Sequence, residues 1–269
     1  MTDGFDAAAR IDTSKMHPAR VYDYLLGGKT NYVVDEEFAE GMIAVDPTVR
    51  NTAMSNRWFM HRATRWLAGR GVGQYMDIGT GIPTEPNLHR IAQQADPTSR
   101  IVYVDNDPIV LRHAEALLDS TPEGSTDYVE ADVRDPAQIV EKAGATLDFK
   151  QPIALSLIAL LHFVGDEDDA YGIVSRLVDA LPAGSYLVIA HVTGDFAPEE
   201  SAEVVARYRR AGSTLRPRTK KEVEQFFDGM DLVEPGLALA PDWNPDLGPD
   251  QPPAGDTPVP VYVGVARKR

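Results

Sequence analysis

The chain contains 269 residues, a length that suits one large domain or one domain with a sizeable extension. Hydrophobic residues make up 43% and charged residues 25%, which excludes a fibrous or wholly disordered chain. The formal net charge is −15 and no cluster of Lys and Arg offsets it, so a nucleic-acid partner is not expected. Because the sequence has no cysteine, disulfides, thiolate metal sites and cysteine nucleophiles are excluded.

Targeting and membrane segments are not expected. The first sixteen residues lack the apolar core of a signal peptide. The most apolar run, 153–164, contains Ser156 and His162 and is too short to cross a bilayer. We therefore expect a cytoplasmic protein that does not bind a membrane.

Residues 15–70 show helical patterns and no strand candidate. The first helix is expected over 19–26, where Gly27 and Gly28 stop it. A second is expected from Asp35, whose side chain can cap it, to about 46. A third is expected over 52–67, with one apolar face formed by Phe59, Ala63, Trp66 and Leu67. We divide the chain into an N-terminal helical extension, 1–70, and a second unit, 71–269.

Strand and helix patterns alternate after residue 70. Five apolar runs are candidate strands, at 74–78, 101–105, 128–132, 153–159 and 186–192. Helical patterns lie between them, and the acidic run 166–169 is interpreted as a helix start and not as a metal site. Strands that are apolar on both faces indicate a parallel sheet covered on both sides, so the expected fold is α/β and doubly wound.

The C-terminal part adds two helices and two strands. The helices are expected over 199–211 and 220–229, and the strands over 232–240 and 261–266. Between these strands, the proline-rich segment 241–260 is expected to be a loop.

Ligands of open parallel sheets bind beyond the carboxyl ends of the strands, so the residues at those ends indicate the chemistry. The first strand ends at Asp77 and leads into Gly79-Thr80-Gly81, where glycine permits a tight turn. The next two strands end in carboxylates. The residues that we expect to bind a cofactor are therefore Asp77, Gly79, Thr80, Gly81, Asp105, Asn106, Asp132 and Val133. Carboxylates can accept hydrogen bonds from ribose hydroxyls and from an adenine amino group, which favours an adenosine-containing ligand.

The turn after the first strand differs from a dinucleotide-binding motif. A third glycine is expected there for close packing around a pyrophosphate, and Thr84 occupies that position after Pro83. Asp77 would also repel a pyrophosphate, whereas it suits the ammonium and sulfonium groups of S-adenosylmethionine. Thr84 with Glu85 and Pro86 is expected to begin a helix whose free N–H groups favour an anion.

These motifs resemble those of class I, Rossmann-like S-adenosylmethionine-dependent methyltransferases. The segments that carry the resemblance are 76–84, 102–107, 129–133, 153–163 and 181–189. The stretch ARVYDYLLGGKTNY at 19–32 is similar to a bacterial S-adenosyl methyltransferase family first catalogued as a domain of unknown function, and the likeness runs over nearly the whole chain.

The resemblance implies a seven-stranded sheet with an antiparallel last strand at 261–266. It also implies that Gly79, Thr80 and Gly81 line the methionine portion, Asp105 holds the ribose, and Asp132 with Val133 brackets adenine. Ile82-Pro83 stands where the family often has a further glycine.

Methyl transfer from a sulfonium mainly requires alignment of the reacting atoms, and a hydroxyl or protonated amine acceptor also needs a general base. His162 follows the fourth strand and is the candidate base; His191 at the end of the fifth strand is a second. Packed structural histidines are the alternative for both.

The N-terminal helices are expected to cover the site as a lid. Tyr22, Tyr24, Asn31 and Tyr32 surround the glycine pair and are candidate lid or substrate residues, with half-buried packing as the alternative for the tyrosines. Trp243 on the proline-rich loop is a further candidate substrate contact.

Three residues of the third helix are expected to contribute to packing or to surface pairing and not to the site. Arg57 can pair with the cofactor carboxylate or with a surface acid, and we favour the surface pair. Trp58 and Trp66 are expected in the core.

Together these observations predict an S-adenosylmethionine-dependent methyltransferase that acts on a small molecule. A nicotinamide-dependent oxidoreductase and a non-catalytic module that binds S-adenosylmethionine or its product are the alternatives.

Overall fold

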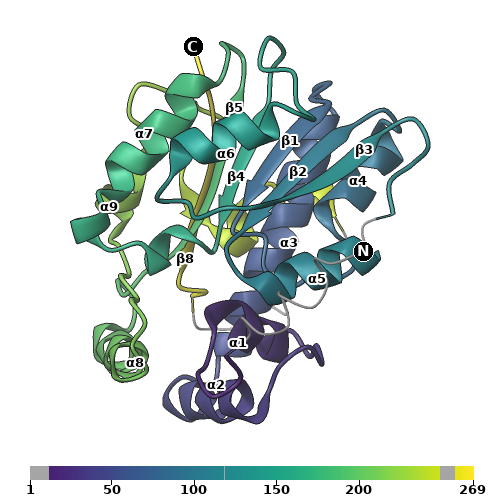
Figure 1. The fold of residues 1–269 in the computed structure, drawn as a ribbon. Helices are drawn as coiled ribbons and strands as arrows, with labels where there is room; N and C mark the ends of the chain where they lie inside the picture. Colours follow the sequence, from purple (N-terminus) through teal and green to yellow (C-terminus); the bar gives the residue numbers. More distant parts are fainter. Residues whose placement is uncertain (1–11, 118, 249–257) are drawn as a thin grey trace.

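A single mixed sheet with helices on both faces forms the centre of the protein (Figure 1). The computed structural model describes residues 12–117, 119–248 and 258–269. The strands are β1 (Gln74–Ile78), β2 (Arg100–Asp105), β3 (Ser125–Glu130), β4 (Ala154–Ile158), β5 (Tyr186–Val192), β6 (Asp231–Leu232), β7 (Ala238–Leu239) and β8 (Val261–Arg267). They lie in the order β3-β2-β1-β4-β5-β8-β6, and β7 also pairs with β8.

The first five strands are parallel, and β8 runs antiparallel to β5, β6 and β7. The expected doubly wound α/β fold with an antiparallel last strand is confirmed. The sheet has eight strands where seven were expected, because the strand predicted over 232–240 is divided in two. Between its two parts Pro235 has no N–H to donate, and Gly236 adopts a φ of +84° in a turn closed by its N–H and the Val233 carbonyl.

The helices that surround the sheet have the following bounds: α1 (Pro18–Leu25), α2 (Val33–Val45), α3 (Val49–Ala68), α4 (Leu88–Ala95), α5 (Pro108–Leu117), α6 (Pro136–Ala143), α7 (Ala170–Ala180), α8 (Pro198–Arg210) and α9 (Lys220–Glu224). Short 3₁₀ turns include η2 (Leu161–Phe163), η3 (Asp166–Asp168), η4 (Gln225–Phe227), η5 (Ala240–Asp242) and η6 (Pro245–Leu247). The acidic run 166–169 does form a helix start, since Asp169 caps α7 by accepting from the Gly172 N–H at 3.1 Å.

Alternating side chains of the strands fill two cores, one on each face of the sheet. Met76 of β1 packs with side chains of α6, α7 and η4. Its neighbour Tyr75 packs on the opposite face with α3 and α4. The predicted apolar face of α3 is confirmed, since Phe59, Ala63, Trp66 and Leu67 are all buried there.

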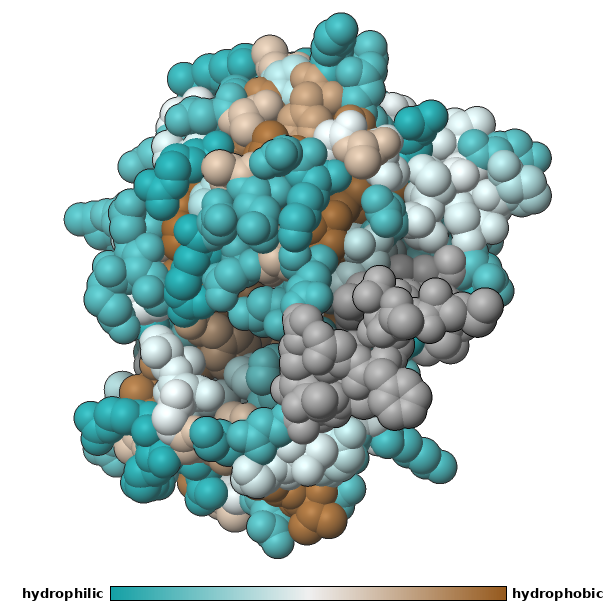
Figure 2. All heavy atoms as spheres, in the orientation of Figure 1, coloured by the Kyte–Doolittle hydropathy of each residue, from teal (hydrophilic) through white to brown (hydrophobic). Residues whose placement is uncertain are grey.

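The helix α3 therefore belongs to the core of the sheet, and residue 70 does not mark a break in packing. The helices α1, α2 and α8 form a separate apolar cluster with the start of α3, which includes Val21, Leu25, Phe38, Met42 and Tyr208. This group lies below the sheet in Figure 1. Figure 2 shows a mainly hydrophilic face with hydrophobic residues in a recess between the sheet and this group.

Within the described residues, each helix is too short or too polar to serve as a transmembrane span. The cytoplasmic location expected from the sequence stays a prediction.

Candidate functional site

A cavity of about 550 Å³ lies at the carboxyl ends of the parallel strands. The ends of β1, β2, β4 and β5 line it on one side, and α1, α2, α3 and α8 line it on the other. The order of the strands reverses between β1 and β4, which lie side by side in the sheet. Open α/β sheets bind their ligands at this point of reversal. The volume is within the range of small-molecule sites.

The eight residues that the strand-end argument selected all line this cavity: Asp77, Gly79, Thr80, Gly81, Asp105, Asn106, Asp132 and Val133. These residues from three strand ends therefore form one connected surface.

The turn after β1 is held against the end of β2. The Gly79 N–H donates to the Val104 carbonyl at 2.7 Å, and the Gly81 N–H donates to Asp105 Oδ2 at 2.8 Å. Both glycines have positive φ, +73° and +65°. A Cβ on Gly79 would lie 2.6 Å from the Leu160 side chain, so a larger residue would displace one wall of the cavity.

Asp77 and Arg57 place opposite charges at the β1 end of the cavity. Burial raises the pKa of the Asp77 carboxyl to about 6, although a Thr80 hydrogen bond and Arg57 act in the opposite direction. Arg57 lines the same cavity, donates to the carbonyls of Thr84 and Pro86, and has a buried Nε without a hydrogen-bond partner among the described residues. The favoured surface ion pair of Arg57 is therefore wrong, because α3 passes beneath the end of β1 and carries its guanidinium inward.

The carboxylates after β2 and β3 are held by backbone donors. Burial raises the pKa of Asp105, whose Oδ1 accepts from the Asp107 N–H at 3.0 Å. At Asp132, burial opposes ionisation, but hydrogen bonds from the Arg134 N–H and the Asn106 amide outweigh it and lower the pKa. Asp105 keeps lone pairs for a ligand, since it accepts from the N–H groups of Gly81 and Asp107 and a carboxylate can accept about four hydrogen bonds. Both oxygens of Asp132 also accept from the Arg134 guanidinium.

The two candidate histidines lie in different places. His162 lines the cavity on η2, and its buried Nδ1 has no hydrogen-bond partner among the described residues. Burial, together with His191 and Arg218, lowers the pKa of His162 well below 6.5. His191 is fully buried away from the cavity lining, where its Nε2 accepts from Arg218 at 3.0 Å and its Nδ1 contacts the Val192 carbonyl at 2.8 Å. The expectation that His191 faces the site is wrong, because Arg218 occupies its ring nitrogen.

Of the four candidate lid residues, Tyr22 alone lines the cavity. Its hydroxyl donates to the Ala53 carbonyl at 3.0 Å and accepts from the Asn56 amide at 2.7 Å. Tyr24 instead donates to Glu40, and Asn31 donates to Asp23. Tyr32, 39% exposed, lies just before α2. Partners within the helical extension hold Tyr24 and Asn31 away from the site.

Trp243 does not contact the cavity. It is fully buried on the α3 face of the sheet, with ring centroids 5.3 Å from Phe59 and 6.2 Å from Trp66, and its carbonyl accepts from Arg62 Nε at 2.9 Å. The turn η5 directs the chain back to α3, where a large indole can be buried. Trp66 is in the core as expected, and Trp58 is half-buried. The rest of the predicted loop, 249–257, lies outside the described residues.

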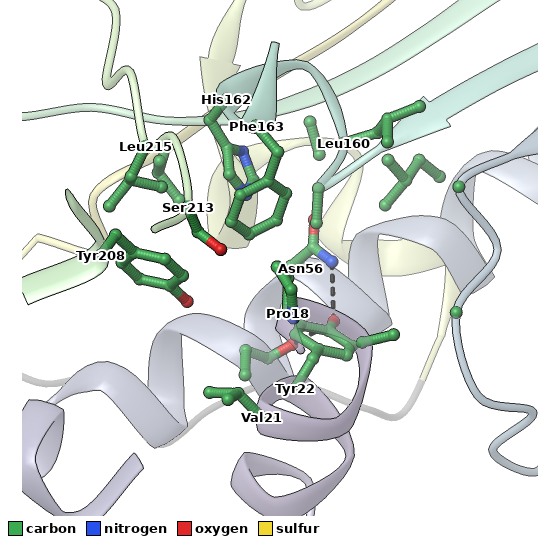
Figure 3. Close-up of a pocket in the computed structure, with 18 of the residues that line it drawn as sticks. Pro18, Val21, Tyr22, Asn56, Leu160, His162, Phe163, Tyr208, Ser213 and Leu215 are labelled. Carbon is green, nitrogen blue, oxygen red and sulfur yellow. Dashed lines mark hydrogen bonds between the residues drawn. The ribbon is translucent and has the colours of Figure 1, made fainter. Parts of the chain in front are cut away.

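Several lining residues had no recognisable sequence signal. Figure 3 shows Phe163, Tyr208, Ser213 and Leu215 together on one side of the cavity, opposite Val21 and Tyr22 of α1. They come from η2 and from the segment around the end of α8, which the sequence did not place at the strand ends. Among the described residues, no group of three or more His, Asp and Glu side chains is arranged for a metal ion.

Comparison with known families decides the class of this cavity. The model of the S-adenosyl methyltransferase family matches residues 5–269, nearly the whole chain. The chain belongs to the S-adenosyl methyltransferase family. The resemblance stated from the motifs is confirmed, and the protein is an S-adenosylmethionine-dependent methyltransferase with S-adenosylmethionine as its cofactor. This assignment decides against the oxidoreductase and the non-catalytic module.

Solved structures agree with the family assignment. A DUF574 family protein from Streptomyces avermitilis is 49% identical, with a TM-score of 0.93 over 97% of this chain and 100% of the other. A candidate methyltransferase from Thermobifida fusca is 36% identical, with a TM-score of 0.86 over 96% of this chain and 97% of the other. No functionally curated protein matches the sequence.

Proposed function

We propose that this S-adenosyl methyltransferase transfers the methyl group to a small molecule held in the same cavity as its cofactor. The observation that carries the proposal is that one continuous cavity joins the carboxylates of the strand ends to apolar walls on α1, α2 and α8. A nucleic-acid acceptor is disfavoured because the chain carries a net charge of −15.

The strand-end half has the donor and acceptor groups that the cofactor needs. Asp105 would accept from the ribose hydroxyls, and Asp132 with Val133 would bracket adenine. Asp77 would face the ammonium group of the methionine portion, and Arg57 would face its carboxylate. The cofactor fits this half because its ammonium and carboxylate groups would each meet a side chain of opposite charge. The Arg57 Nε is also buried without a hydrogen-bond partner among the described residues.

Bound S-adenosylmethionine supplies a methyl group already activated by the sulfonium. The protein then has to align the acceptor and remove its proton where the acceptor atom carries one. His162 would take up that proton, since its imidazole lines the cavity.

Of the residues 1–70 that were expected to form a lid, we assign this function to the helices α1 and α2 only. These helices cover the strand ends, and His17 Nδ1 at the start of α1 lies 3.0 Å from Asp107 Oδ2, just after β2. We propose that both helices shield the transferring methyl group from water.

Calorimetric titration with S-adenosylhomocysteine tests the cofactor placement. Asp105→Asn should weaken binding about tenfold or more, since a charge-assisted hydrogen bond is worth roughly 1.5–3 kcal/mol. The control Asp179→Asn removes an exposed carboxylate from α7 and should leave the affinity unchanged. Unchanged affinity in folded Asp105→Asn would place the ribose elsewhere and overturn the proposal.

A further inference from the structure

The half of the cavity away from the strand ends has walls of a distinct chemical character. We call this half the acceptor chamber and define it by Val21, Met42, Val49, Phe163, Tyr208 and Leu215. These side chains come from α1, α2, α3, η2, α8 and the segment after α8. Walls of this kind bind apolar surface, because their contact with a ligand removes apolar area from water on both sides.

The charges of the cavity are distributed unevenly. Arg57 and Arg134 are its described lining cations, and both lie beside the strand ends, where Arg134 pairs with Asp132 and Asp168. An anionic acceptor would therefore meet no cation in the chamber.

The chamber also provides little for a cationic acceptor. Asp46 lines its α2 side, but Asp46 Oδ1 accepts from the backbone and hydroxyl of Thr48 at 2.8 and 2.6 Å. Glu200 is exposed on α8 and remains hydrated. A neutral ligand is the class that loses least on entering such a chamber.

Polar groups also lie along the cavity walls. The Tyr208 hydroxyl has no hydrogen-bond partner among the described residues, although only 5% of the residue is exposed. The Ser213 hydroxyl contacts only the weak acceptor Met16 Sδ, at 3.8 Å. His162 adds an imidazole with an unpartnered Nδ1 beside the Phe163 ring, at a centroid distance of 4.4 Å (Figure 3).

We propose that the acceptor is a neutral, flat molecule with a hydroxylated ring, of the phenol class, which lies on the wall of Phe163 and Tyr208 and is methylated on oxygen. The acceptor oxygen forms a bond to the methyl carbon as the carbon–sulfur bond breaks, and the hydroxyl proton passes to His162. The sulfur leaves uncharged, and His162 returns its proton to water after product release. This inference rests on the proposed function, since it assigns a substrate class to the same cavity.

Binding measurements separate this proposal from its competitors. The probes are a naphthol, a naphthoate and a naphthylmethylamine, titrated by calorimetry into the protein saturated with S-adenosylhomocysteine. We expect the naphthol to bind at least tenfold more tightly than either charged probe. Leu215→Arg, which places a cation in the chamber wall, should reverse the preference between naphthol and naphthoate. The control Leu232→Arg changes a leucine that is 40% exposed on β6 and should alter neither affinity.

Turnover tests the role of His162. With S-adenosylmethionine, mass spectrometry should detect the methyl ether of the naphthol. His162→Ala should lower kcat about 100-fold or more while the naphthol Kd changes less than threefold, and added imidazole should restore part of the rate.

The outcomes distinguish the two proposals. If S-adenosylhomocysteine does not bind, the proposed function fails. If it binds but the naphthol does not, or a charged probe binds more tightly, only the substrate class is wrong. Methylation on a ring carbon, or no transfer to the oxygen of bound naphthol, overturns the assignment of a hydroxyl acceptor.

Discussion

Asp77→Asn should stabilise the unliganded protein while weakening its affinity for the cofactor. Burial raises the pKa of this carboxyl from 3.8 to about 6, so the folded state holds the proton more tightly than the unfolded state does. At pH 7 the carboxylate is ionised in both states, and its ionisation therefore destabilises the folded protein.

The magnitude follows from the size of the pKa shift. Roughly two pKa units correspond to about 3 kcal/mol as an upper limit, at about 1.4 kcal/mol per unit. Water in the cavity screens the carboxylate, so an increase of about 1–3 kcal/mol in the free energy of unfolding is expected for Asp77→Asn at pH 8. The wild-type penalty decreases as the pH falls below 6, and the difference between the two proteins should shrink to roughly half at pH 5.

Urea denaturation of both proteins without cofactor, at pH 8 and pH 5, measures this difference. Asp179→Asn on the exposed face of α7 is the control and should match the wild type at both pH values. Titration with S-adenosylhomocysteine should show about tenfold weaker binding to Asp77→Asn. A less stable variant, or a stability difference that does not change with pH, would refute the reasoning.

Three further predictions concern the core and the surroundings of His162. Trp243→Ala should lower the free energy of unfolding by about 3–5 kcal/mol in urea denaturation, because a fully buried indole is lost; a cost below about 1 kcal/mol would contradict its burial. Arg218→Met should cost about 1–3 kcal/mol in the same assay, since it leaves the Leu161 and Val164 carbonyls without their donor, and a neutral result would contradict this network. The pKa of His162 lies well below 6.5, so its imidazole remains neutral as the pH falls from 8 to 6.5. The kcat at saturating substrates should therefore not decrease over this range. A change in kcat near pH 7 that is present in the wild type and absent from His162→Ala would contradict the lowered pKa.

The strand ends could be predicted from the sequence because their position depends on sheet topology alone. Once β1, β2 and β3 are parallel, Asp77, Asp105 and Asp132 must meet at one edge, whatever the helices do. The bounds of β1 and β5 were also predicted to the residue.

Residues outside the strand ends depend on tertiary packing that the local sequence does not encode. Trp243 is buried because the chain turns back toward α3 after β7. Arg57 reaches the cavity because α3 passes beneath the end of β1. The helix expected at Thr84 begins instead at Leu88 with Asn87 as its N-cap, because the Thr84 N–H is bonded to the Asn87 side chain at 3.0 Å. Tyr208 had no detectable signal, since α8 reaches the cavity by packing on α2 and on Phe163 of η2.

A crystal structure of the protein with S-adenosylhomocysteine would test the shared cavity most directly. We expect the ribose on Asp105, the adenine beside Asp132, and the sulfur directed toward the chamber that contains Phe163, Tyr208 and His162. A sulfur that faces solvent, or a nucleoside bound away from Asp105, would contradict it.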